Sequence, residues 1–139
     1  MAERDAITGF YKALHGILTE AAGVPCYSIE PPRRDDGALD VEPPFVAYTE
    51  SMTAPTDEGG SWSIGLQLDA WSTFGTTEAL GILRALDAAL DGTARRLECG
   101  TICADRSGLC FQRMEHDPHD ARIRRARSNY LIRFDMNPE

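Results

Sequence analysis

Hydrophobic and polar residues alternate along residues 62–71, and this regular stretch lies in the middle of the chain. A period of two places alternate side chains on opposite faces of an extended chain, so the stretch predicts a strand with one apolar face. The apolar positions are Trp62, Ile64, Leu66, Leu68 and Ala70. The other face, which includes Gln67 and Asp69, is mixed.

The period lengthens after this strand. Over residues 76–90, apolar residues recur every three or four positions, which predicts an amphipathic helix. They are Ala79, Leu80, Leu83, Leu86, Ala89 and Leu90. Thr76 is the expected N-cap, Glu78 places a negative charge in the first turn, and Asp91-Gly92 is the expected end. Because the helix and the strand each have one apolar side, we expect them to pack together at the centre of the core.

A second amphipathic helix is predicted near the N-terminus, over residues 7–21. Its apolar positions are Ile7, Phe10, Tyr11, Leu14, Ile17, Leu18 and Ala21. Gly23 and Pro25 are expected to end it.

Shorter patterns predict the remaining strands. These strands are Cys26–Ile29, Phe45–Met52, Leu97–Ala104 with a break near Gly100, Leu109–His116, and Tyr130–Met136. Two polar stretches, residues 33–44 and 53–61, are predicted to be exposed loops. The predicted fold is a single α+β domain over residues 1–139. It has a mainly antiparallel sheet of four to five strands with the two amphipathic helices packed on one face.

The charge of the chain argues against some classes of function. The chain carries 14 basic and 22 acidic residues, a formal net charge of −8, which argues against a general basic surface for nucleic acid. Eight of the acids lie between Ser28 and Gly60, where Arg33 and Arg34 are the basic residues. No apolar run approaches the roughly 20 residues of a membrane-spanning helix, and the charged N-terminus is unlike a signal peptide. We therefore expect no membrane association, and free cysteine thiols in a reducing cytoplasm.

Candidate catalytic and metal-binding groups lack the spacing that their chemistry requires. Cys99, Cys103 and Cys110 are spaced C-x3-C-x6-C with Cys26 remote, whereas structural zinc prefers tight pairs, so small buried residues are the expected role. The HDPHD run at residues 116–120 is typical of a polar turn rather than a metal site. Walker and GxGxxG sequences are absent, and residues 59–63 depart from the GxSxG motif at their last position. We predict no enzymatic activity, catalytic residue, cofactor or metal, because an enzyme using Cys or His would lack partners for these groups.

Four arginines, Arg122, Arg124, Arg125 and Arg127, form a basic cluster. Three acids precede it: Glu115, Asp117 and Asp120. Ion pairs across a hairpin, a contact between subunits, and contact with phosphate all remain open for this cluster.

The order of these segments resembles that of the small tail-completion, or tail-terminator, proteins of long-tailed bacteriophages and gene transfer agents. The resembling parts are the first helix (Ile7–Ala21), the strand Pro44–Tyr48, the Gln-Leu-Asp-Ala-Trp run (Gln67–Trp71), the helix Thr77–Asp87 and the aromatic strand Tyr130–Phe134. The resemblance implies a structural virion protein of the tail or neck, without enzymatic activity, assembled in the bacterial cytoplasm. It further implies a homo-oligomer, a hexameric ring that terminates the tail tube and joins it to the head-tail connector (stopper) protein.

We expect particular residues to form contacts or to line the ring, on the basis of the resemblance, the polar loops and the charges. Subunit or tube contacts are expected from Arg122, Arg124, Arg125, Arg127, Thr56, Asp57 and Glu58. DNA passing through such a ring without specific binding needs a lumen that does not attract phosphate. This requirement favours an acidic lining from Asp35, Asp36, Asp40, Asp57 and Glu58. The alternative function is a small ferredoxin-like ligand-binding or regulatory domain, which requires a concave pocket with convergent polar groups.

Overall fold

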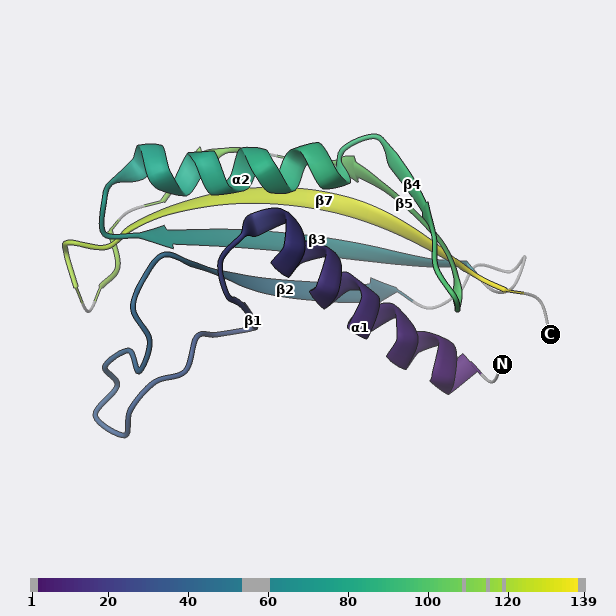
Figure 1. Ribbon diagram of the computed structural model, residues 1–139, viewed down its shortest axis with the longest axis horizontal. Coiled ribbons are helices and arrows are strands. Elements are labelled where there is room, and N and C mark those ends of the chain that lie inside the picture. The colour runs from purple at the N-terminus through teal and green to yellow at the C-terminus, as the bar shows by residue number, and fades with distance from the viewer. Residues whose placement is uncertain (1–2, 54–60, 109, 115, 119, 138–139) are drawn as a thin grey trace.

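The computed structural model describes residues 3–53, 61–108, 110–114, 116–118 and 120–137. Within these ranges the chain forms two helices and seven strands, which confirms the α+β class but exceeds the four to five strands expected (Figure 1). The elements are α1 (Glu3–Ala22), β1 (Cys26–Ser28), β2 (Phe45–Thr53), β3 (Ser61–Ser72), α2 (Thr76–Leu90), β4 (Thr93–Arg96), β5 (Gly100–Arg106), β6 (Gln112–Arg113) and β7 (Arg124–Met136).

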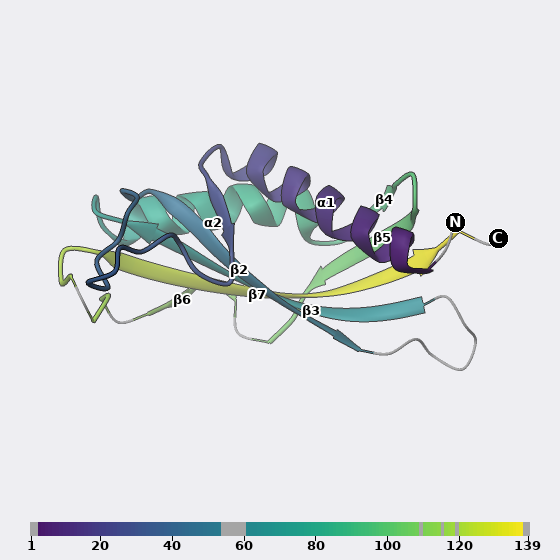
Figure 2. The same ribbon diagram turned by 90° about the horizontal axis from the view of Figure 1, so that it is seen from below.

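The centre of the sheet is the antiparallel pair of β3 and β7. Their pairing runs from Ser61 opposite Asp135 to Ser72 opposite Arg124. The strand order is β1-β2-β3-β7-β5-β4, and β6 pairs with the start of β7. Among the described strands, β1 and β2 pair in parallel and the other pairs are antiparallel. Figure 2 shows both helices on the same side of this twisted sheet.

The main hydrophobic core lies between the helices and the sheet. Alternate residues of the two central strands face into it: Ile64, Leu66 and Leu68 from β3, and Tyr130, Ile132 and Phe134 from β7. The rings of Phe10 in α1 and Phe134 lie 4.9 Å apart, and Leu83 in α2 is fully buried in the same core. The expectation that both helices cover one face is therefore confirmed.

The start of α2 differs from the prediction. The helix begins at Thr76, but the residue before it, Gly75, is the N-cap, with φ of 105° and no side-chain cap. The chain turns sharply here, and this conformation is easy only for glycine. Ser72 links the end of β3 to the first turn of α2 instead. Its hydroxyl donates to Glu78 Oε1 at 2.6 Å and accepts a hydrogen bond from the Phe74 N–H. The predicted end is confirmed, since α2 stops at Leu90 and Gly92 has φ of 67°.

The segment after α2 is a hairpin rather than one interrupted strand. β4 and β5 pair antiparallel, and the break predicted near Gly100 is the turn between them. The sequence does not reveal β4 because three of its four residues are exposed and show no alternation. A Cβ atom at Gly100 would collide with the Asp135 carbonyl oxygen of β7, so the close approach of the two strands requires glycine.

The predicted strand Leu109–His116 is wrong for most of its described length. β6 covers only Gln112–Arg113, because Phe111 has a positive φ of 56° and interrupts the extended chain. The last strand is longer than predicted, since β7 begins at Arg124 rather than Tyr130. Its first half buries Ala126 and Ser128, which are too small or polar to produce an apolar pattern. Three of the four clustered arginines therefore belong to a strand.

Residues 29–44, which we term the excursion, connect β1 to β2 and are only partly exposed. Leu39 and Val41 pack against a second, smaller cluster formed by Phe45, Trp71 and Ile123. The predicted exposed loop at residues 33–44 is exposed at most of its charged positions, but Leu39 and Val41 depart from the prediction because they pack on one end of the sheet.

Candidate assembly surface

The face of the sheet opposite the helices, which we term the open face, carries a charged cluster near the excursion. Arg127 donates from Nε to Asp69 Oδ1 at 2.7 Å and from Nη2 to Oδ2 at 3.2 Å. Arg125 Nη2 lies 3.4 Å from the same Oδ2. The Asp69 carboxylate raises the pKa of Arg127, and this paired geometry stabilises both charges.

Trp71 joins this charged cluster to the excursion. The guanidinium of Arg125 lies 4.4 Å from the Trp71 ring centroid, and that of Arg33 lies 5.9 Å from it. Arginine over an aromatic face is attracted by the ring quadrupole. Arg125 and Arg127 therefore have internal partners on β3, and the excursion reaches the same cluster through Arg33 over Trp71. The sequence identified neither Asp69 nor Trp71 as a partner. One feature of the sequence pointed to this pairing: Asp69 is an acidic residue on the mixed face of an otherwise regular strand.

Arg122 and Arg124 differ from the other two arginines because both are exposed. Arg122 donates from Nε at 3.0 Å and from Nη2 at 2.7 Å to the Asp120 carboxylate. These bonds lower the pKa of Asp120 to about 2. Arg124 Nη1 donates to the Ala121 carbonyl. Of the interpretations left open for the cluster, an ion pair with one of the three preceding acids is seen for Arg122 with Asp120 in the described part of the chain.

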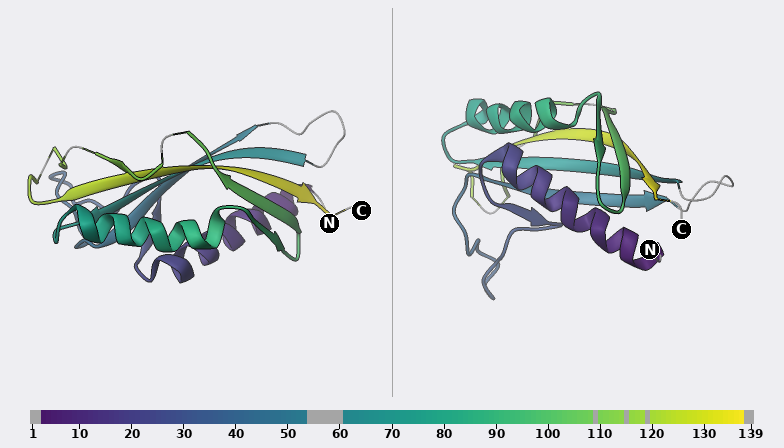
Figure 3. Two further views of the ribbon diagram at one scale, coloured as in Figure 1. Left: turned by 90° about the horizontal axis from the view of Figure 1, so that it is seen from above. Right: turned by 45° about the vertical axis from the view of Figure 1, so that its right-hand side comes forward.

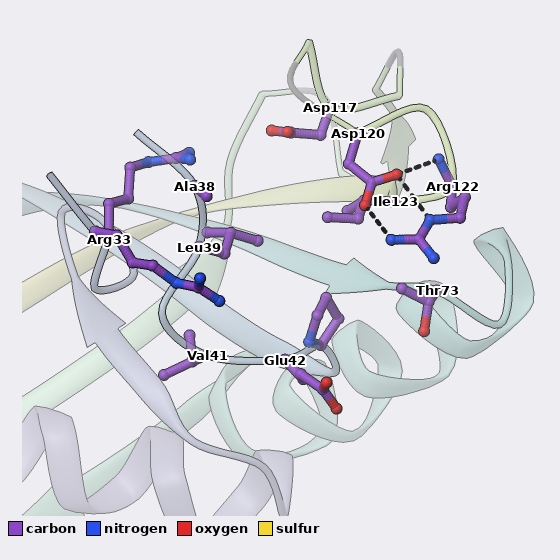
Figure 4. A pocket seen from close by; sticks show the side chains of 12 residues that line it. Arg33, Ala38, Leu39, Val41, Glu42, Thr73, Asp117, Asp120, Arg122 and Ile123 are labelled. Carbon is purple, nitrogen blue, oxygen red and sulfur yellow. Dashed lines mark hydrogen bonds and ion pairs between the residues drawn. The ribbon is translucent and has the colours of Figure 1, made fainter. Parts of the chain in front are cut away.

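A pocket of about 620 Å³ lies between the excursion and the turn at residues 117–123. Figure 4 shows side chains of the excursion facing Asp120 and Arg122 across it. Its walls combine basic, acidic and apolar residues, including Arg33, Arg34, Glu42, Leu39 and Ile123. This mixture suits a surface that meets another polar surface more than a site built for one small molecule.

The acids predicted to line a lumen lie in two segments. Asp35, Asp36 and Asp40 are exposed in the excursion; Asp36 Oδ1 accepts the Ala38 N–H at 3.0 Å, and Asp40 lies 3.9 Å from Arg34. Thr56, Asp57 and Glu58 fall outside the described residues. The excursion leads into the start of β2, whereas residues 54–60 follow its end at Thr53. At about 3.4 Å per residue, these two anchor points are about 27 Å apart.

The four cysteines are free, as expected, but they do not share one environment. Cys26 and Cys99 are buried, whereas Cys103 is exposed and Cys110 is half-buried and donates to the Asn129 carbonyl at 3.1 Å. His15 is exposed, and its Nδ1 lies 3.1 Å from the Tyr48 hydroxyl oxygen. Among the described residues, no group of three or more His, Cys, Asp or Glu side chains has the arrangement of a metal site. Neither helix, within the part of the chain described, is long and apolar enough to cross a membrane.

The fold of this chain is similar to that of a solved structure. No protein-family model matches the chain, and no curated protein matches it. Among solved structures, a chain from a structure described as "Virion of native gene transfer agent (GTA) particle" has a TM-score of 0.58 and 18% sequence identity. The match covers 85% of this chain and 84% of that chain. At this level of identity, the comparison shows that the two chains share a fold over nearly their whole lengths.

Proposed function

We propose that this protein is a non-enzymatic structural component of a phage or gene transfer agent virion. In this proposal, six copies form a ring that terminates the tail tube and joins it to the head-tail connector. The observation that carries the proposal is the shared fold with a chain of a gene transfer agent virion, over 85% of this chain. The order of helices and strands that resembles tail-completion proteins supports the finer role.

The charged surfaces of the chain support an assembly role. Arg124, the first residue of β7, is exposed, and the exposed Arg122 just before it lines the pocket with mixed charge. Arg125 and Arg127 have a different role in the proposal, because their bonds to Asp69 hold the surface in shape. We assign Arg122 and Arg124 to subunit or tube contacts, and Thr56, Asp57 and Glu58 to the same class of contact.

A direct test is electron microscopy and sedimentation of the purified protein, alone and with tail tubes that lack a terminator. We expect a ring with sixfold symmetry that binds one end of each tube. A monomer that leaves the tube ends bare would contradict the proposal.

The exposed arginines can be tested within that assay. Arg122→Glu combined with Arg124→Glu is expected to leave the monomer folded and to abolish tube capping, since both side chains lie at the surface. Arg4→Glu, an exposed arginine in the first turn of α1, is the matched control and should cap tubes normally. Normal capping by the double variant would exclude these two arginines as contacts.

The alternative function is a small ferredoxin-like ligand-binding or regulatory domain, and the pocket of about 620 Å³ would be its site. Arg33, Arg34 and Arg122 are the cations that line it. A soluble monomer whose melting temperature rises with phosphorylated metabolites would support this candidate over the ring.

A further inference from the structure

A groove of about 500 Å³ lies beside α2, outside the surfaces discussed so far. Leu80 and Phe111 supply apolar walls, and Gly81 forms part of the lining. Arg84 is the charged residue among the described residues that line the groove, and it is exposed. Among the described residues, Arg84 has no ion-pair partner. The groove therefore combines an apolar hollow with an unpaired positive charge.

The middle of the open face is the second uncovered surface. Figure 3, left, shows both helices beneath the sheet, so the helices do not cover the opposite side of the central strands. Leu131 on β7 is 53% exposed there, and its register partner on β3 is Gly65. On the other side, Leu131 pairs with Asp105 of β5, which is exposed and has no ion-pair partner within the described part of the chain. This surface therefore presents an apolar side chain beside an unpaired negative charge.

Each surface contains a glycine that the chain's own packing does not require. A Cβ atom at Gly65 or at Gly81 would meet nothing within 4 Å, and neither residue has a positive φ. Glycine weakens the interior of both strands and helices, and in a strand it often marks a place where another chain approaches closely. Both glycines therefore leave open space at the surface of the fold.

We propose that these two surfaces bind each other in adjacent copies of the chain. Leu131 of one copy enters the α2 groove of the next, and Asp105 pairs with Arg84. The opposite signs of the two free charges favour a second copy as the occupant, because each surface supplies what the other lacks. The two surfaces differ, so the contact is head-to-tail and closes into a ring at the right rotation. This inference rests on the proposed function and names the surfaces that would build the ring.

Charge reversal tests the pairing directly. Arg84→Glu and Asp105→Arg each place like charges at the contact, so each variant alone should need about tenfold or more protein to assemble in sedimentation velocity. Both positions are exposed, and circular dichroism should confirm folded monomers. A 1:1 mixture of the two variants should regain assembly, because each contact then joins opposite charges. The double variant Arg84→Glu/Asp105→Arg should assemble alone for the same reason.

Filling the groove gives an independent test. Gly81→Leu is expected to abolish assembly while keeping α2 helical, since leucine favours helix more than glycine does. Gly16 in α1 is the matched control, because a Cβ atom there also meets nothing within 4 Å, and Gly16→Leu should assemble normally.

The outcomes separate this inference from the proposed function. Wild-type rings together with unchanged assembly of the single variants, or failure of the mixture to recover, would overturn the contact and leave the ring function standing. Rings that respond to the variants as expected but never bind tail tubes would support the contact and overturn the proposed function. A wild-type chain that stays monomeric at all concentrations would overturn both.

Discussion

Two acidic residues on neighbouring strands show how differently one fold treats a carboxylate. Asp69, on the open face of β3, is 7% exposed and accepts bonds from Arg127. Glu50, on the helix side of β2, has a buried Oε2 atom without a hydrogen-bond partner among the described residues. Burial raises the pKa of Glu50, and its own backbone N–H offsets this only partly. The first carboxylate thus joins segments of the fold, whereas the second costs stability when it is charged.

The pKa shift of Glu50 predicts a pH dependence. Because its folded-state pKa lies above the ordinary value of 4.5, the folded chain holds this proton more tightly than the unfolded chain. The resulting stabilisation is full below pH 4.5 and is lost as the pH rises through the raised pKa. Glu50→Gln, which stays neutral, should therefore gain about 1 kcal/mol over wild type between acidic and neutral pH. Urea denaturation of both proteins across this range is the measurement, and a constant difference would contradict the prediction.

The helices and strands depend on one another because each is apolar on one side only. α1 and α2 place their buried residues on the face that β3 and β7 present with Ile64, Leu66, Ile132 and Phe134. The helices lie side by side across the sheet, so the loss of packing from either one exposes the same core.

Core truncation in either helix should destabilise the whole domain. Phe10 and Leu83 are fully buried, so Phe10→Ala and Leu83→Ala should each lower the free energy of unfolding by about 2–5 kcal/mol. Leu131→Ala removes the same atoms as Leu83→Ala from a half-exposed position, and it should cost about 0.5 kcal/mol or less in the monomer. Chemical denaturation midpoints measure all three, and equal midpoints for Leu83→Ala and wild type would contradict the packing described above.

The whole molecule is an elongated layer whose two ends carry different segments (Figure 1). One end holds the excursion with Asp35, Asp36 and Asp40, together with the turn that carries Arg122. β2 ends at Thr53 and β3 begins at Ser61 at the far end.

We also propose that the acids expected to line the lumen do so, and this acidic lining predicts a salt-dependent effect on DNA passage. Asp35→Arg combined with Asp36→Arg, or Asp57→Arg combined with Glu58→Arg, should slow DNA ejection because each arginine near a phosphate adds affinity that falls as salt rises. The pair that lines the lumen should show the defect, and the defect should shrink at high salt. Wild-type ejection kinetics at low salt for both pairs would remove the acidic lining from the proposal.

Local periodicity along the chain determines much of this protein. Both helices, β2, β3 and the end of β7 follow from spacing in the sequence, because a helix or strand sorts side chains onto faces within a few residues. The α+β class and the shared helix face follow from the same patterns. The tertiary structure alone decided the strand order, the hairpin of β4 and β5, and the cover that Leu39 and Val41 give to Trp71. It also decided that Arg127 pairs with Asp69, which is 58 residues away in the sequence. These features depend on which distant segments meet in space, and spacing along the chain carries no information about that.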